Sequence, residues 1–173
     1  MCVNNAFTST RILIAVDGST PAEWATEVAR SLATTLGGRV LYVYVVEPLV
    51  IDQANPLAVT EAERVQREVG EMLLAKNKAS TAASLAPETR LLFGQAVYEI
   101  AAAADDWKAD FIVLGSRGRG RIAQLFVGST TTGVIRTASC PVIAVSHKPR
   151  TAFSAPFRAT RRSNRRQDAQ IPV

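Results

Sequence analysis

Short apolar runs alternate along this chain with longer segments in which apolar residues recur at helical spacing. A continuous run of four to eight apolar residues is typical of a strand buried on both faces. Five strands are predicted, at 11–16, 39–46, 88–93, 110–114 and 141–145. Four helices are predicted between them, at about 21–36, 61–76, 97–104 and 130–138. Strands that alternate with helices form right-handed βαβ units, so we expect an α/β fold: an open, doubly wound, five-stranded parallel sheet of order 3-2-1-4-5 with helices on both faces.

Local signals mark where two of these helices begin. Thr20 is predicted as an N-cap, with Pro21 at the first helical position and Glu23 three residues after the cap. The run from Thr60 to Glu63 predicts a second capping box. In the helix that follows, one side is predicted to run through Ala62, Val65, Val69, Met72, Leu73 and Lys76, with polar residues opposite.

Length and composition favour one globular domain. The chain has 173 residues, of which 47% are hydrophobic, enough for a sizeable core. We expect a flexible N-terminus at 1–9, the domain at 10–147 and a tail at 148–173. No apolar run approaches the roughly 18 residues of a membrane span, no secretory signal is visible, and two cysteines do not form a disulfide framework. We therefore expect a cytoplasmic protein in which Cys140 is an inert, buried thiol.

The positive charge is concentrated at the C-terminus. Residues 148–173 carry seven Lys and Arg and one acid, a net +6, and the rest of the chain is −1, which together make the overall +5. The body is therefore nearly neutral, and the high isoelectric point does not indicate a nucleic-acid-binding domain. We interpret the tail as a disordered, solvated extension. The alternative is an electrostatic contact with nucleic acid or an acidic membrane.

The loop from Gly115 to Ser129 carries the strongest chemical signal. It follows an apolar strand, precedes a helix and contains Arg117, Arg119 and Arg121. Because glycine has no Cβ, backbone N–H groups in such a loop can approach phosphate oxygens. Arginines can pair with phosphate bidentately, and we expect at most one or two of them to reach a ligand, with Arg117 as the candidate. The alternatives are ordinary turn glycines and a solvated charged surface.

The start of the fourth helix adds to this phosphate signal. Gly128, Ser129 and Thr130 are predicted at its N-terminus, where free N–H groups and the helix dipole favour an anion. Simple helix capping uses the same geometry without a ligand and remains the alternative.

Asp17 follows the first predicted strand, and Gly115 follows the fourth. In a sheet of this order, ligands bind at the carboxyl ends of the strands where the order reverses, so both residues should face one crevice. A carboxylate there suits ribose hydroxyls or helps to hold a cation. The alternative is a turn aspartate that accepts a hydrogen bond from its own backbone.

Catalytic signatures are missing from the sequence. His147 is the only histidine, and there is no His–Cys cluster, no Ser–His–Asp set and no Gly-x4-Gly-Lys-Ser/Thr loop. With no general base to name, the sequence favours a protein that holds a nucleotide over one that consumes it. A slow ATPase or a nucleotidyl-transfer enzyme remains the alternative.

These motifs resemble the nucleotide-binding branch of the universal stress protein family. Its signature, Gly-x2-Gly-x9-Gly-Ser/Thr, is met by Gly115, Gly118, Gly128 and Ser129. Three further segments are similar: the start Ile-Leu-Ile-Ala-Val-Asp17-Gly-Ser19, the strand end Tyr44-Val-Val-Glu-Pro48, and the close Cys140-Pro-Val-Ile-Ala-Val145. The resemblance spans roughly residues 9–147.

The resemblance implies a homodimeric, ATP-binding regulatory protein of the stress response. It implies that Asp17 contacts the ribose, that Val45 offers backbone hydrogen bonds to adenine, and that the fifth strand, Pro141 to Val145, joins two subunits. The phosphates, with Mg²⁺ or Mn²⁺, would be held by Gly115, Gly118, Gly128, Ser129 and Thr130. A scaffold whose basic tail binds nucleic acid is the remaining alternative.

Two features depart from the family pattern. The Arg-rich tail is one. The other is the run Thr130-Thr-Thr-Gly133, which replaces a more apolar helix start and places a glycine that costs about 1 kcal/mol relative to alanine inside the helix.

Overall fold

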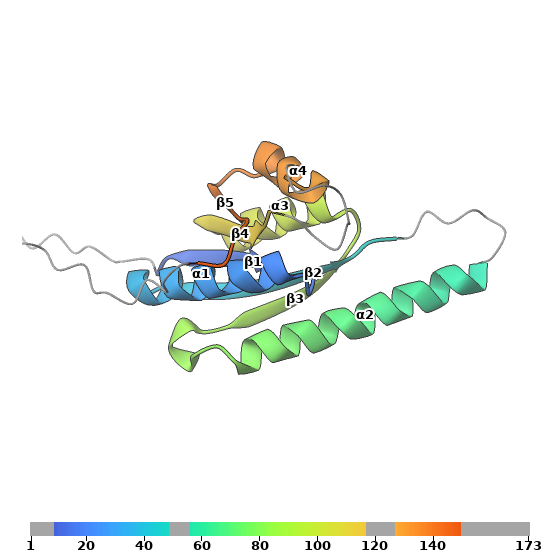
Figure 1. Ribbon diagram of the computed structural model, residues 1–173, viewed down its shortest axis with the longest axis horizontal. Coiled ribbons are helices and arrows are strands. Elements are labelled where there is room, and N and C mark those ends of the chain that lie inside the picture. The colour runs from blue at the N-terminus through green and yellow to red at the C-terminus, as the bar shows by residue number, and fades with distance from the viewer. Residues whose placement is uncertain (1–8, 49–55, 117–126, 150–173) are drawn as a thin grey trace, which may run out of the picture.

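One parallel sheet of five strands organises the chain, in the order β3-β2-β1-β4-β5 (Figure 1). The computed structural model describes residues 9–48, 56–116 and 127–149. The strands are β1 (Arg11–Ala15), β2 (Arg39–Val46), β3 (Glu88–Phe93), β4 (Phe111–Gly115) and β5 (Val142–Val145). The helices are α1 (Thr20–Leu36), α2 (Pro56–Ala79), α3 (Ala96–Trp107) and α4 (Ser129–Thr137), with a short 3₁₀ helix η1 (Ala83–Leu85). The predicted fold class and strand order are confirmed.

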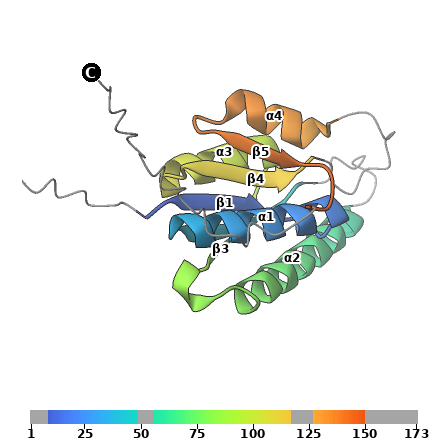
Figure 2. The same ribbon diagram turned by 60° about the vertical axis from the view of Figure 1, so that its left-hand side comes forward.

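The two faces of the sheet carry separate cores. Ile12, Ile14 and Tyr42 belong to the core beneath α1 and α2, whereas Leu13 and Leu41 belong to the core beneath α3 and α4. This alternation follows from the strand period of two, and it explains why β1 and β2 are continuous apolar runs (Figure 2).

Both predicted capping boxes are wrong. The N-cap of α1 is Ser19, one residue before Thr20, and its hydroxyl accepts the N–H of Ala22 at 3.3 Å. Ser19 has the extended backbone that an N-cap needs, at φ −78° and ψ 155°. The second helix, α2, begins at Pro56, so the run from Thr60 to Glu63 lies inside it. The predicted end of α1 is confirmed at Gly37, whose φ is 62°.

The buried side of α2 also differs from the prediction. Val65 and Met72 are 45% and 63% exposed, whereas Gly70 and Leu74 are buried. A Cβ on Gly70 would lie 2.5 Å from Cδ1 of Tyr44 on β2. Glycine therefore allows α2 to lie directly against a tyrosine ring, a contact that helical periodicity does not reveal.

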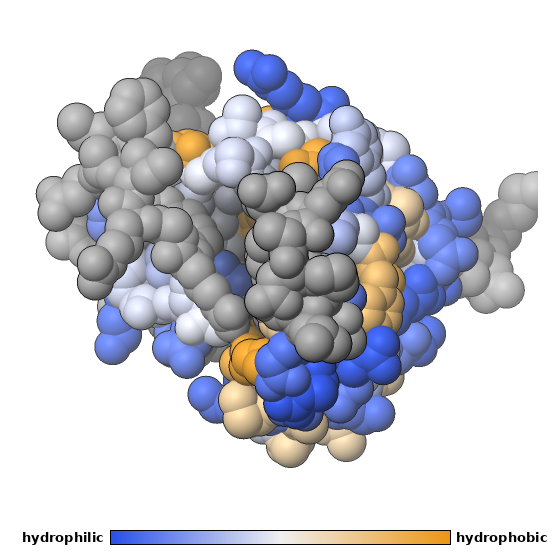
Figure 3. Space-filling view, turned by 90° about the vertical axis from the view of Figure 1, so that its right-hand side faces the viewer, coloured by the Kyte–Doolittle hydropathy of each residue, from blue (hydrophilic) through white to orange (hydrophobic). Residues whose placement is uncertain are grey.

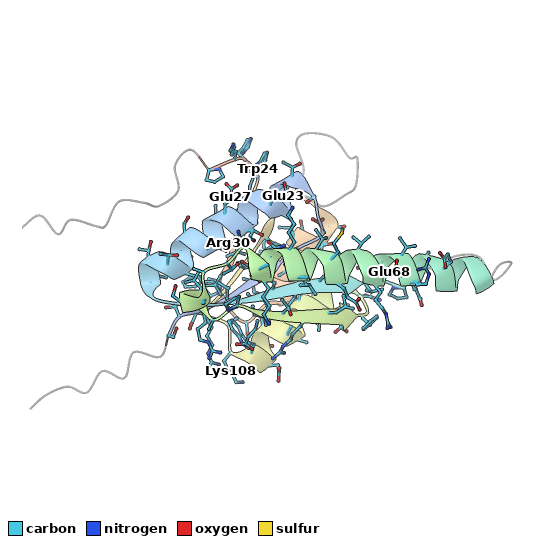
Figure 4. The ribbon with its side chains drawn as sticks, turned by 90° about the horizontal axis from the view of Figure 1, so that it is seen from below. Glu23, Trp24, Glu27, Arg30, Glu68 and Lys108 are labelled. Atoms are coloured by element: carbon cyan, nitrogen blue, oxygen red, sulfur yellow. The ribbon has the colours of Figure 1, made fainter. Side chains whose placement is uncertain are left out.

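A partly buried polar network holds α1 against the end of α2; Figure 4 labels its central residue, Arg30. Arg30 donates from Nε to the Tyr42 hydroxyl at 2.8 Å, and from Nη2 to Oδ1 of Asn77 at 3.1 Å and Oγ of Ser80 at 2.8 Å. The Tyr42 hydroxyl also shares a hydrogen bond with Thr81 at 2.8 Å. Because α1 starts at the carboxyl edge of the sheet, this network fixes the helix that borders the candidate site.

Candidate functional site

The carboxyl edge of the sheet opens between β1 and β4. These strands are neighbours, with Ala15 in register with Leu114. The chain leaves β1 for α1 on one face of the sheet, and it leaves β4 for α4 on the other. The chain therefore leaves these neighbouring strands for opposite faces of the sheet, which makes this edge the topological switch point where a ligand crevice is expected. Figure 3 looks onto this edge, where hydrophobic residues lie among hydrophilic ones.

Asp17 lies in the first of these turns. It is half-buried, and its Oδ1 accepts the N–H of Ser19 at 2.9 Å. The turn passes through Gly18, whose φ of 80° favours glycine. The structure thus gives Asp17 the turn-forming role weighed as the alternative, and it also places the carboxylate beside the switch point. The ribose contact stays a prediction.

Gly115 ends β4 in close contact with α1. A Cβ at this position would lie 2.7 Å from the backbone N of Ala22 and 2.8 Å from the backbone C of Pro21. The absence of a side chain is therefore required by packing against the first turn of α1. The predicted phosphate contact would be an additional role for this glycine.

The N-terminus of α4 is tied back to the end of β4. Gly128 is its N-cap, and its N–H donates to the Ser116 carbonyl at 2.7 Å. The hydroxyl of Thr131, which is buried, donates to the Gly115 carbonyl at 2.9 Å. The first helical residue is Ser129, one before the predicted Thr130. This anchoring explains a polar helix start, because one threonine hydroxyl joins α4 to the sheet.

The capping of α4 differs from that of α1. Ser19 supplies a side-chain acceptor to α1, whereas the N-cap of α4 is a glycine and makes no side-chain capping bond. Ser129 at the first helical position is exposed, and Thr130 is half-buried. The first turn of α4 therefore presents backbone N–H groups that its own N-cap side chain does not occupy, which is the arrangement that favours an anion.

Gly133 has a packing role in the second turn of α4. A Cβ there would lie 2.5 Å from Cγ2 of Val97 on α3. The glycine that appeared as a cost in the sequence lets α4 lie close to α3, and this contact determines where the first turn of α4 lies.

Val45 lies where β2 extends past the end of β1. The Val43 carbonyl accepts the N–H of Val16 at 2.9 Å, so residue 43 directs its backbone groups toward β1. Residues two apart in a strand direct these groups to the same side. Val45 therefore directs its N–H and C=O toward the β1 side, beyond Ala15, where β1 ends. This is the orientation that a backbone contact with a nucleobase needs.

The described part of the chain thus brings Asp17, Gly115, Gly128, Ser129 and Thr130 to one edge, with Val45 directed toward it. Arg117 and Gly118 lie outside the described residues, as does the tail from residue 150. Within residues 9–48, 56–116 and 127–149, no group of three His, Cys, Asp or Glu side chains could hold a metal ion. No helix of these same segments is long and apolar enough to span a membrane.

Cys140 is half-buried between α4 and β5. Desolvation raises the pKa of its thiol, and the negative charge of Asp105 raises it further. A thiol with a raised pKa has little thiolate at neutral pH, which supports the predicted inertness, although the thiol is only half-buried and not fully buried as predicted.

Comparison with known proteins gives one consistent family. The family model described as the universal stress protein family matches residues 8–146. A universal stress protein of Thermus aquaticus is 38% identical over 134 residues, which cover 78% of this chain and 96% of that protein. The solved structure of the universal stress protein UspA from Lactobacillus plantarum has a TM-score of 0.70 and 26% identity, covering 79% of this chain and 97% of its own.

Two further solved structures share the fold and contain a nucleotide. One is a universal stress protein in complex with cAMP, with a TM-score of 0.53 and 20% identity, covering 81% of this chain and 98% of its own. The other, from Archaeoglobus fulgidus, is in complex with dAMP and has a TM-score of 0.52 and 23% identity, covering 80% and 98%.

Proposed function

Because the chain belongs to the universal stress protein family, we propose that it binds an adenine nucleotide, ATP, and acts as a cytoplasmic regulatory protein of the stress response. The observation that carries the proposal is the first turn of α4, which has a glycine N-cap and is held against the end of β4 at the switch point. Its N–H groups and the positive end of the helix dipole suit a phosphate group.

The proposed ligand lies across the crevice. Its phosphates contact the N–H groups of Ser129 and Thr130, next to the N-cap Gly128, whose own N–H donates to the Ser116 carbonyl. Gly115, Arg117 and Gly118 complete the phosphate loop. Its ribose lies beside Asp17, and its base meets the backbone of Val45. The choice of adenine is supported by the two related structures, since cAMP and dAMP are both adenine nucleotides.

We propose that Mg²⁺ or Mn²⁺ enters with the nucleotide. Over the described ranges the chain offers no cluster of three metal-binding side chains, so the phosphate oxygens would supply most of the ligands. Hard cations of this kind are commonly held by one or two carboxylates together with substrate phosphates. Asp17, in the turn that follows β1, is the candidate carboxylate.

Isothermal titration with ATP and Mg²⁺ tests the proposal directly. We expect saturable heat with the full chain, and no heat at millimolar nucleotide would overturn it. The site is tested by Gly128→Asp, since the backbone of Gly128, at φ −60° and ψ 155°, accepts any residue. An aspartate N-cap would occupy the N–H groups of α4 and repel phosphate.

The expected effect of Gly128→Asp is large on binding and small on folding. Two like charges about 4 Å apart repel by about 4 kcal/mol near a protein surface, so ATP affinity should fall at least about tenfold. Thermal stability should stay equal or rise, because aspartate is a favourable N-cap. Gly128→Asn has the same shape without the charge and should weaken ATP binding less. Equal losses in both variants would contradict a phosphate at this helix.

We also propose a homodimer joined through β5. This strand is the last in the sheet, and Pro141 and Val145 direct their carbonyls toward β4. Val142 and Ala144 therefore direct their backbone groups outward, by the alternation of the strand. An edge strand that exposes such groups is usually covered, and a second copy of β5 would cover it.

A further inference from the structure

The part of β2 that extends past β1 is closed at its far end by a side chain from α2. The Val46 carbonyl accepts the N–H of Gly94 at 3.1 Å, on the β3 side. Because the C=O of one residue and the N–H of the next point in opposite directions across a peptide plane, the Glu47 N–H points to the β1 side. Oε1 of Gln66 accepts that N–H at 3.3 Å, and Nε2 of Gln66 donates to the Glu47 carbonyl at 3.2 Å.

The carboxamide of Gln66 thus takes the place of a continued β1. A primary amide offers an acceptor and donors on one group, and here it makes both hydrogen bonds to Glu47 that, in a parallel pair, two residues of the neighbouring strand would otherwise make. On the β1 side of β2, Val43 is bonded to Val16 and Glu47 is bonded to Gln66. These two residues are four positions apart, about 13 Å along a strand. Val45 is the residue between them that faces the same side.

The side chain of Glu47 extends the same arrangement to α3. Its Oε1 accepts the N–H of Ala96, the first residue of α3, at 2.9 Å. The N-cap of α3, Gln95, makes no side-chain capping bond, so the carboxylate of Glu47 does this from a neighbouring strand. Glu47 is therefore held by α2 through its backbone and holds α3 through its side chain.

We infer that the Gln66–Glu47 pair positions the stretch of β2 beyond the end of β1 for nucleobase recognition. This inference rests on the proposed nucleotide site. It adds the residues that fix the position of the Val45 backbone relative to the base. Val45 presents one donor and one acceptor in a fixed order. Adenine matches them with its N1 acceptor and N6 donor, and guanine presents an acceptor at O6 and a donor at N1, in the reverse order. The order of donor and acceptor at Val45 can discriminate between the bases only if the strand end keeps its position, and the Gln66–Glu47 pair keeps it from shifting or fraying.

A positioning role for the Gln66–Glu47 pair and a purely stabilising role predict different nucleotide affinities. If the pair only stabilised the fold, its loss would weaken the binding of all nucleotides by the same factor. If it sets the register at Val45, its loss should act on the base end of the ligand and should reduce the preference for ATP over GTP. The phosphate contacts at α4 would be unchanged.

The test compares the full chain with Gln66→Met, which keeps the length of the side chain and removes both hydrogen bonds. Gln66→Ala is a second variant, and Glu68→Met is the matched control, since Glu68 lies on the same helix and its carboxylate pairs with Arg64. Affinities for ATP and GTP are measured by displacement of a fluorescent ATP analogue. Amide hydrogen exchange at Val45 and Glu47 is measured without nucleotide.

We expect Gln66→Met to bind ATP about tenfold more weakly, as when a binding-competent conformation becomes a minor state. The ATP-to-GTP affinity ratio should fall toward one, and the amides of Val45 and Glu47 should exchange faster. Glu68→Met should match the unmodified chain in all three measurements. An unchanged ATP affinity, or equal losses for ATP and GTP, overturns the inference while the proposed function stands. No ATP binding by the unmodified chain overturns both.

Discussion

Gly133 of α4 lies against Val97 of α3. We therefore predict that the effect of Gly133→Ala on the free energy of unfolding changes sign with the residue at position 97. In Gly133→Ala, the new Cβ would lie 2.5 Å from Cγ2 and 3.0 Å from Cγ1 of Val97. Valine is β-branched and stiff at χ1 in a helix, so the clash is not relieved by a simple rotation. The two helices must separate, or the side chain must leave its preferred rotamer.

Two opposing terms set the magnitude. Overpacking of this kind costs about 1–3 kcal/mol. Replacing an interior helical glycine by alanine gains about 1 kcal/mol of helix propensity. The net change for Gly133→Ala in the unmodified chain is therefore a destabilisation of about 0–2 kcal/mol.

The sign should reverse in a Val97→Ala background. That substitution removes both γ-carbons and leaves the Cβ of residue 97, which would lie 3.3 Å from the new Cβ at residue 133 and needs only a small adjustment. The propensity gain then prevails, and Gly133→Ala should stabilise the chain by up to about 1 kcal/mol. The coupling energy between the two substitutions should be about 1–3 kcal/mol.

The assay is urea unfolding of the four proteins of this double-mutant cycle, followed by circular dichroism. If the four proteins have the same dependence of the free energy of unfolding on urea concentration, a change in the urea concentration at the midpoint reports a change in stability. Additivity within about 0.5 kcal/mol would refute the close approach of the two helices, because independent sites add within this limit.

Two further outcomes follow from the edge strand and from the helix start. Ala144→Pro removes an N–H that points away from β4, so the fold should remain intact while the proposed dimer dissociates; sedimentation equilibrium checks this, and a dimer of unchanged affinity would contradict pairing through β5. Ser19→Ala removes the acceptor for the Ala22 N–H and should destabilise the chain by about 0.5–2 kcal/mol in thermal unfolding. Thr20→Ala is its control and should have little effect, whereas the reverse ranking would restore Thr20 as the cap.

The sheet order could be predicted because it depends on a repeated pattern. Alternation of buried runs and helical periods leaves few topologies once right-handed crossovers are required. The candidate residues at the switch point follow from the same rule, since the ends of neighbouring strands must meet. This is why Asp17 and Gly115 could be assigned to the same edge of the sheet before their surroundings were known.

Helix starts were harder to predict because the capping residues are common. Ser19 and Thr20 are both good N-caps, and the backbone conformation and the turn at Asp17 decide between them. The Thr60-to-Glu63 pattern is a false signal, since Pro56 already provides the fixed φ that suits a first helical turn.

The roles of the interior glycines could not be predicted because each depends on a contact distant in the sequence. Gly70 meets Tyr44, Gly115 meets Pro21 and Ala22, and Gly133 meets Val97. The pairing of Gln66 with Glu47 spans 19 residues and leaves no periodic trace. Contacts of this kind depend on how two elements pack against each other. The patterns in a single sequence predict the type of each element, and they do not predict which residues of two elements meet.

The contact of Gly115 with the first turn of α1 limits how far β4 and α1 can move relative to each other. Backbone touches backbone there, so the end of β4 cannot move toward α1, and α1 cannot tilt toward β4. Arg30 holds the far half of the same helix to α2. The end of β4 and the start of α1 therefore keep a fixed position relative to each other, so a nucleotide bound as proposed would order this side of its site at little cost in conformational entropy.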